Sequence, residues 1–373
     1  MLHSSIPVDL FPADYSAAVK RWSNAVAVLS VKATAFPVTG LPATAPGGEA
    51  LFTQTAWLGD ADAPQVLVLI AGTHGVEGFT GTAVQLDFLA RLAGGELSLP
   101  GKTAVLLIHI LTPWGYAWCR RCDEYGIDLN RNFIDFASPP ENPGFLELQP
   151  YIRNPDPEQR VQAFAAYKTR YGVEQFECAV SGGQYVDPAA PFYGGTRINH
   201  GHQVIDTLIG QHRLAQRQLA VVDIHTGLGP YSYGEVICDH PPGSAGLAAA
   251  QNWYGAAVTV PAQGTSSSVP KQGLLDYAWH DIMSGSSCFV TLEFGTYSTS
   301  ALFEALLRDH LFWGETSPEN LAEQVGDAKW RQRWQAASKR MQEHFCPADP
   351  VWREAVLFRS RQVVHQAIAG LSK

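Results

Sequence analysis

Four short apolar runs predict the strands of a buried sheet. Runs of this length with few polar positions are typical of strands that are covered on both faces. They occupy residues 65–71, 103–111, 219–225 and 288–294 and read QVLVLIA, TAVLLIHIL, LAVVDIH and CFVTLEF.

A helical stretch follows the first of these runs. In residues 78–93, Val84, Phe88 and Leu92 recur every four positions, which is the spacing of an amphipathic helix. Strands that alternate with helices in this way predict an α/β fold. We expect a central mixed, mostly parallel twisted sheet with helices on both faces.

The regions around this core have other patterns. Residues 12–35 carry apolar positions at helical spacing, which predicts a helix. Residues 136–200 are rich in Pro, Gly and Asn and contain one predicted helix near 156–171, so we expect an excursion that borders a cleft. A helical C-terminal extension is predicted over 315–373. Because composition changes nowhere sharply, we interpret residues 1–373 as a single domain.

Composition narrows the class of protein. Of the 373 residues, 46% are hydrophobic and 16% charged, which indicates a globular chain with a sizeable core. The net charge of −9 argues against nonspecific nucleic-acid binding. No run of 18 apolar residues predicts a membrane span, and Asp9 and Asp14 are atypical of a signal peptide, so we expect a cytoplasmic protein. Six cysteines are too sparse for a disulfide scaffold, and we interpret the lone Cys119/Cys122 pair as reduced thiols.

The stretch AGTHGVEGFTG, residues 71–81, carries the first candidate for chemistry. His74 and Glu77 lie just beyond a buried strand, where open α/β sheets place their sites. Imidazole nitrogen and carboxylate oxygen are both zinc ligands, and residues three apart at the start of a helix can face one ion. The alternative is a tight turn in which Glu77 caps the next helix.

A catalytic zinc needs a third protein ligand. His225 ends the run LAVVDIH and is the candidate, while Asp223, two residues earlier on the same strand face, could orient it. A rim or core histidine is the alternative. Glu293 ends another apolar strand, where burial would raise its pKa toward a value that suits a general base. Its alternative is a buried carboxylate paired with an arginine.

A polar loop follows in DLNRNF, residues 128–133. Arg131 is suited to a bidentate grip on a carboxylate, and the neighbouring Asn130 offers both donors and an acceptor. A loop held by its own ion pairs is the other interpretation.

Taken together and in this order, the motifs resemble the zinc carboxypeptidase superfamily. The likeness is carried by five stretches and extends over residues 65–296; outside it, the chain loosely resembles a bacterial branch close to the succinylglutamate desuccinylase and aspartoacylase-like deacylases. The five stretches are THGVEG (73–78), PWGYAWCRR (113–121), DLNRNF (128–133), DIHTG (223–227) and TLEFGT (291–296).

The resemblance implies a site with one zinc ion. His74, Glu77 and His225 would hold the metal. Arg131 and Asn130 would bind the terminal carboxylate of the substrate. Arg121, or its neighbour Arg120, would polarise the scissile carbonyl. Glu293 would take a proton from the attacking water and deliver it to the leaving amine. The tyrosine that the family places on a mobile loop has no clear counterpart, although Tyr277 is near in the sequence.

Three functions remain open at this point. The first is a zinc carboxypeptidase that acts on short peptides. The second is a zinc deacylase that acts on N-acyl amino acids with the same ligands; because such deacylases usually carry a β-rich C-terminal domain and this tail is helical, the first is favoured. The third is a binding protein without activity, which would be expected to lack Glu293 or a ligand, yet none is missing.

Overall fold

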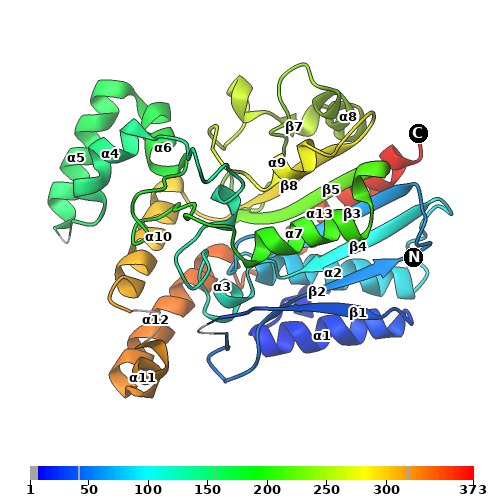
Figure 1. Ribbon diagram of the computed structural model, residues 1–373, viewed down its shortest axis with the longest axis horizontal. Coiled ribbons are helices and arrows are strands. Elements are labelled where there is room, and N and C mark those ends of the chain that lie inside the picture. The colour runs from blue at the N-terminus through cyan, green and yellow to red at the C-terminus, as the bar shows by residue number, and fades with distance from the viewer. Residues whose placement is uncertain (1–6, 41–42, 155, 317–319) are drawn as a thin grey trace.

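The computed structural model describes residues 7–40, 43–154, 156–316 and 320–373. Its centre is one eight-stranded mixed sheet (Figure 1) with the order β1-β2-β4-β3-β5-β8-β6-β7. The strands are β1 (Ala33–Pro37), β2 (Phe52–Leu58), β3 (Gln65–Ala71), β4 (Thr103–His109), β5 (Gln218–Gly227), β6 (Gly234–Ile237), β7 (Val258–Thr259) and β8 (Cys288–Gly295).

The four predicted strands form the parallel centre of this sheet. β4, β3, β5 and β8 are neighbours and run parallel, whereas β1, β2 and β6 pair antiparallel around them. Parallel strands end at the same edge of the sheet, so residues at their carboxyl ends come together. The predicted α/β class with a mixed, mostly parallel sheet is confirmed.

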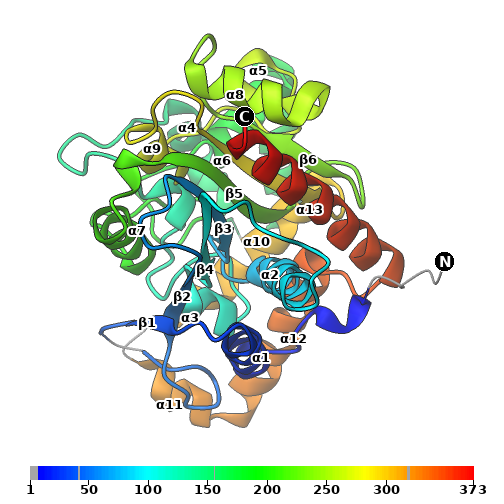
Figure 2. The same cartoon turned by 90° about the vertical axis from the view of Figure 1, so that its right-hand side faces the viewer.

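Helices cover both faces of the sheet, as Figure 2 shows with α1, α2 and α13 on one side and α7 on the other. Alternate residues of β3 serve two cores: Leu67 and Leu69 pack on the side of α2 and α13, whereas Val66 and Val68 pack on the side of α7. Burial on both faces explains why these strands read as continuous apolar runs. The helices of the two faces are α1 (Tyr15–Val28), α2 (Gly78–Ala93), α7 (His200–Gln211), α8 (Ala245–Tyr254), α9 (Asp276–His280) and α13 (Pro350–Leu371).

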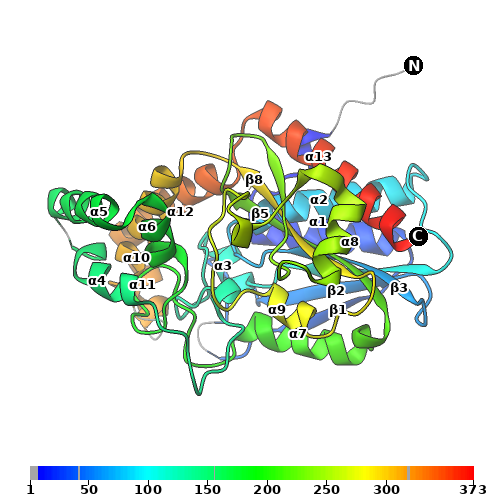
Figure 3. The same cartoon turned by 90° about the horizontal axis from the view of Figure 1, so that it is seen from above.

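The predicted excursion is more helical than its composition indicates. Only the helix near 156–171 was expected, and three are present; they lie together at one end of the sheet beside α10 (Figure 3). The three are α4 (Pro143–Ile152), α5 (Pro157–Tyr171) and α6 (Val173–Ser181), and the remaining helices are α3 (Pro113–Ala117), α10 (Thr299–Trp313), α11 (Leu321–Gly326) and α12 (Ala328–Phe345). The tail after residue 319 is helical, with α11, α12 and α13, while 317–319 lie outside the described residues.

One boundary prediction was wrong. The helix expected over 12–35 ends at Val28, and residues 33–37 form the edge strand β1, which pairs with β2. The side chain of Asp14 accepts a hydrogen bond from the Ala17 amide, which fixes the start of α1. The β-branched and aromatic residues of ATAFP suit a strand, but a short edge strand beside a helix has no distinctive period. No helix among the described residues is long and apolar enough to cross a membrane, and the six cysteines are free thiols.

Candidate metal centre

The three predicted metal ligands meet at the carboxyl ends of β3 and β5. One ligand atom from each of His74, Glu77 and His225 lies within 4.8 Å of the other two. All three side chains are buried, with 1–2% of their surface exposed. The structure thus brings together residues that the sequence separates by about 150 positions.

The turn after β3 places His74 and Glu77. Gly72 has a φ of +73°, a conformation that favours glycine, and a Cβ there would lie 3.0 Å from the Cα of Ile110. The backbone amides of Gly75 and Val76 then donate to the carbonyls of Arg121 and Arg120, at 3.0 and 2.8 Å. These bonds tie the turn to the loop that carries the two predicted arginines.

Glu77 does not serve as the helix cap that the alternative interpretation required. It occupies the N-cap position of α2, but its side chain accepts no capping hydrogen bond there. Its carboxylate instead contacts the Nδ1 atom of His74 at 2.9 Å and that of His225 at 3.2 Å, and accepts a hydrogen bond from the Thr226 amide at 3.0 Å. The carboxylate therefore points into the cluster of ligand atoms.

Each histidine is held by a carboxylate at the ring nitrogen that faces away from the cluster. The Nε2 atom of His225 lies 2.6 Å from Asp223, and that of His74 lies 3.1 Å from Asp128. Thr73 donates to both oxygens of Asp223 at 2.9 Å. Partners of this kind fix the ring orientation and raise the basicity of a metal-ligating imidazole.

The electrostatics of the cluster favour a cation between the two rings. Burial alone would lower the pKa of His225, but Asp223 and Glu77 outweigh it and hold that pKa well above its ordinary value. The Nδ1 atoms of His74 and His225 lie only 3.1 Å apart, so two lone pairs would face each other unless a proton or a metal ion lies between them. Two imidazoles and one carboxylate are a donor set of catalytic zinc sites, so the residues fit this metal.

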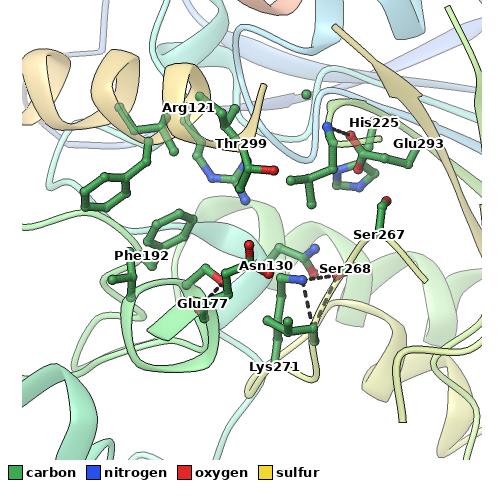
Figure 4. Close-up of a pocket in the computed structure, with 18 of the residues that line it drawn as sticks. Arg121, Asn130, Glu177, Phe192, His225, Ser267, Ser268, Lys271, Glu293 and Thr299 are labelled. Carbon is green, nitrogen blue, oxygen red and sulfur yellow. Dashed lines mark hydrogen bonds between the residues drawn. The ribbon is translucent and has the colours of Figure 1, made fainter. Parts of the chain in front are cut away.

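Glu293 lies next to His225 in the sheet. The two residues are register partners on β8 and β5, and Glu293 lines the same cavity as both histidines (Figure 4). Its Oε1 atom accepts a hydrogen bond from the Leu228 amide at 2.9 Å. Burial, and then the charge of Glu77, raise the pKa of Glu293 to about 7. It makes no ion pair with an arginine among the described residues, in contrast to the alternative interpretation.

Arg121 faces the cavity and is fixed by two carboxylates. Its Nη1 atom lies 2.7 Å from Glu77 and its Nε atom lies 3.0 Å from Asp128. Burial would raise the pKa of Asp128, but the charges of Arg121 and His74 outweigh it and hold that pKa well below its ordinary value. Asp128 therefore stays ionised and links His74 of the metal cluster to Arg121. The sequence motif DLNRNF contains Asp128 but did not indicate this role.

Arg120 points elsewhere. Its Nε atom lies 2.9 Å from Asp309 on α10, and its guanidinium lies over the rings of Trp114 and Trp313. Arg120 is not among the described residues that line the cavity of the metal cluster. Two consecutive arginines thus face different regions, and of the two only Arg121 is placed near the cluster.

Asn130 and Arg131 both lie at the cavity but differ in accessibility. Arg131 is fully buried, and its nitrogens donate to backbone carbonyls: Nε and Nη2 to Ser181 at 3.2 and 2.8 Å, and Nη1 to Asn130. Asn130 accepts a hydrogen bond from the Leu275 amide at 2.7 Å. Tyr277 belongs to α9, and its hydroxyl donates to the Lys271 carbonyl at 3.0 Å, so it is not on an open loop.

The cavity has a volume of about 700 Å³ and two dissimilar parts. Near the metal cluster its walls are polar and include Lys271, Asp239 and Asp276, none of which the sequence had indicated, since each is a lone charge in a loop or short helix. Away from the cluster, α5, α6 and α10 contribute a group of apolar side chains to the walls, together with the charged Arg160, Lys168, Glu177, Glu304 and Arg308. The residues of this apolar part are Val161, Phe164, Ala165, Phe176, Val180, Leu302, Phe303 and Leu306.

Several solved structures are similar to this chain. A carboxypeptidase A from Helicoverpa armigera is 14% identical; the match covers 89% of this chain and 73% of that one, with a TM-score of 0.48. A metallo-carboxypeptidase from Pseudomonas aeruginosa is 14% identical; the match covers 94% of this chain and 70% of that one, with a TM-score of 0.41. An aspartoacylase family protein from Mesorhizobium loti is 14% identical; the match covers 76% of this chain and 66% of that one, with a TM-score of 0.37. These are proteins of the two groups that the sequence resembles.

Comparison with sequences gives the family. No curated protein matches the chain. A family model described as "protein of unknown function (DUF2817)" matches residues 11–359, which is nearly the whole chain. The protein therefore belongs to the DUF2817 family.

Proposed function

We propose that this protein is a zinc-dependent hydrolase that cleaves an amide bond next to a free carboxylate, and that it acts as a carboxypeptidase on short peptides. The observation that carries the proposal is the convergence of His74, Glu77 and His225 within 4.8 Å, on the wall of a cavity that Glu293 also lines. A zinc ion held there would act as a Lewis acid that polarises a substrate carbonyl and makes water easier to deprotonate.

Glu293 is placed to move the protons of the reaction. With a pKa of about 7 it is largely ionised at slightly alkaline pH, and it can still hold the proton that it accepts. The Leu228 amide fixes one of its oxygens, and the other has no hydrogen-bond partner among the described residues. Glu293 takes a proton from the attacking water and gives it to the nitrogen that leaves, so that the amide C–N bond is replaced by a carboxylate and a free amine.

Arg121 is placed to stabilise the negative charge that develops on the carbonyl oxygen. Glu77 and Asp128 hold two of its nitrogens, and its Nη2 atom has no protein partner among the described residues. A fixed cation costs no reorganisation when the tetrahedral oxyanion forms. By analogy with a single oxyanion-hole donor, such a group contributes about 3–4 kcal/mol of transition-state stabilisation.

A second candidate function is supported by the apolar part of the cavity. An N-acyl amino acid deacylase would use the same metal cluster and Glu293, but would place an acyl chain on the far side of the scissile bond. The ring of Phe164 lies there with its centroid 5.2 Å from that of Phe176 and 5.6 Å from that of Phe303. An apolar acyl group would bury its surface against them.

One experiment tests both candidates. The zinc-loaded protein is incubated with a panel of dipeptides and a panel of N-acyl amino acids, including medium-chain acyl groups, and the release of free amino acid is measured. Glu293→Gln and metal-stripped protein serve as controls. Release from dipeptides supports the carboxypeptidase and release only from acylated substrates supports the deacylase. If neither panel is hydrolysed by protein that holds zinc, the proposal is wrong.

A further inference from the structure

Lys271 places a cation inside the cavity, and it is not one of the site residues predicted from the sequence. Figure 4 shows its side chain reaching into the cavity, with its amino end beside Asn130 and Ser268 and with His225 and Glu293 across from it. The residue lies in the segment that leads to α9, and its Nζ atom makes no hydrogen bond or ion pair with a predicted metal ligand among the described residues. Its charge is therefore available to the substrate half of the cavity.

The protein holds Lys271 in place without neutralising it. The Nζ atom donates to the hydroxyl of Ser268 and, at 3.0 Å, to the carbonyl of Val269, while Tyr277 donates to the carbonyl of Lys271 itself. No carboxylate within the described residues forms an ion pair with Nζ. Burial, followed by the charge of Arg131, lowers the pKa of Lys271 to about 8, although Asp239 and Glu293 oppose this. An ammonium in such surroundings gains most from an anion that arrives with the ligand.

Arg131 does not offer the same contact. It is fully buried, and its Nε, Nη1 and Nη2 atoms each donate to a backbone carbonyl of Ser181 or Asn130. These bonds use three of its five N–H groups, and turning the buried guanidinium toward a ligand in the cavity would break them and leave carbonyl oxygens without donors, which is costly in a buried place. The bonds instead join the loop of Asn130 to the end of α6.

Asn130 complements Lys271. Its Oδ1 atom accepts from the Leu275 amide at 2.7 Å, which fixes the orientation of the side-chain amide and leaves Nδ2 with no partner among the described residues. An ammonium and an amide N–H₂ on one wall of a cavity form a donor pair that a carboxylate, with its two oxygens, can accept.

We propose that Lys271 Nζ and Asn130 Nδ2 bind the free carboxylate of the substrate, and that Arg131 is a positioning residue that holds Asn130. This inference rests on the proposed function for the choice of substrate and extends it, because it assigns a carboxylate-binding residue and requires an anionic group on the leaving-amine side of the scissile bond. Lys271 is then a determinant of specificity for acids over amides.

The test measures binding and does not depend on turnover. Isothermal titration calorimetry compares the binding of 3-phenylpropanoate with that of its uncharged amide analogue, 3-phenylpropanamide. The titrated proteins are zinc-loaded wild type, Lys271→Met and Lys271→Arg. Lys102→Met is the matched control, since Lys102 is exposed and precedes β4 at the far end of that strand. We expect the wild type and the control to prefer the acid, Lys271→Met to bind the acid about 10- to 100-fold more weakly with the amide unchanged, and Lys271→Arg to keep part of the preference.

The outcomes separate this inference from the proposed function. If Lys271→Met binds the acid as the wild type does, or if the wild type does not prefer the acid, Lys271 is not the carboxylate-binding residue, whatever the protein hydrolyses. If the preference depends on Lys271 but no peptide or N-acyl amino acid is cleaved, the carboxylate site is supported and the hydrolase proposal fails. With a cleaved substrate, Lys271→Met should raise KM for the acid far more than it lowers kcat.

Discussion

The Nδ1 atoms of His74 and His225 lie 3.1 Å apart, although the residues are separated by 151 positions in the chain. β3 and β5 are adjacent and parallel, so the turn after β3 and the end of β5 meet at one edge of the sheet. The other ring nitrogen, Nε2, contacts a carboxylate in both residues: Asp128 in the case of His74 and Asp223 in the case of His225. Both rings therefore direct Nδ1 toward Glu77, as a shared cation requires.

Asp223 should control metal affinity through His225. Asp223→Asn removes the negative charge that lies 2.6 Å from Nε2 of His225 and orients its ring. Loss of such a partner of a metal-bound histidine typically lowers metal affinity about 10- to 100-fold. We expect the zinc Kd, measured by competition with a chromophoric chelator, to rise by that factor. Asp62→Asn, at an exposed pair with Arg213, should leave the Kd unchanged. An equal Kd for Asp223→Asn and wild type would contradict this role.

Glu293 should be required for turnover but not for metal binding. Glu293→Gln keeps the shape of the side chain and its bond to the Leu228 amide but removes the base, so we expect kcat to fall by about 10²- to 10⁴-fold. Zinc content should stay near one ion per chain. Glu343→Gln, on the exposed face of α12, is the control. Full activity of Glu293→Gln would rule out the proposed role.

Activity should rise with pH through about 7. Burial and the charge of Glu77 raise the pKa of Glu293 to about 7, and only its ionised form can accept a proton. We expect kcat/KM to increase about tenfold per pH unit below that value and to level off above it. A flat pH–rate profile would contradict the assignment.

The raised pKa of Glu293 also affects stability, because folding then stabilises the protonated carboxyl group. This contribution to the free energy of unfolding is fully present below a pH of about 4.5 and is lost as the pH rises through about 7. The wild type should therefore lose stability relative to Glu293→Gln over this range.

Arg120 and Arg121 should give opposite phenotypes. Arg120→Ala leaves Asp309 as an unpaired buried charge, so we expect the free energy of unfolding to fall by about 3–5 kcal/mol. Arg121→Ala should instead lower kcat about 10²- to 10³-fold with a smaller loss of stability, because Glu77 and Asp128 keep His74 as a partner. Chemical denaturation and steady-state kinetics on both variants measure the two effects. An active-site defect in a fully stable Arg120→Ala protein would reverse the assignment made from the geometry.

The sequence predicted the part of the fold that is buried on both faces. The four central strands were visible because their apolar runs have no polar alternation, and His74, Glu77, His225 and Glu293 were noticed because they interrupt or end such runs. β2, β6 and β7 were not predicted. β2 has 7 residues, as β3 does, but mixes polar and apolar ones without a clear period, whereas β6 and β7 have only 4 and 2 residues. The boundary between α1 and β1 was missed for the same reason.

Apart from the metal ligands that the resemblance grouped, contacts between distant segments could not be predicted. Whether Arg120 or Arg121 faces the cavity depends on Asp309, which lies 189 positions later on α10. His200 and His202 begin α7, where His200 contacts Thr53 and His202 stacks on Phe133, and both partners lie far away in the sequence. Lys271 had no local signal at all, because only the folded chain places it beside Asn130.

A crystal structure of the zinc-loaded protein, with anomalous diffraction data collected at the zinc absorption edge, would locate the metal itself. We expect one anomalous peak about 2.0–2.2 Å from Nδ1 of His74, Nδ1 of His225 and a carboxylate oxygen of Glu77. A fully zinc-loaded protein with no peak among these three residues, or with its only peak elsewhere, would contradict this expectation.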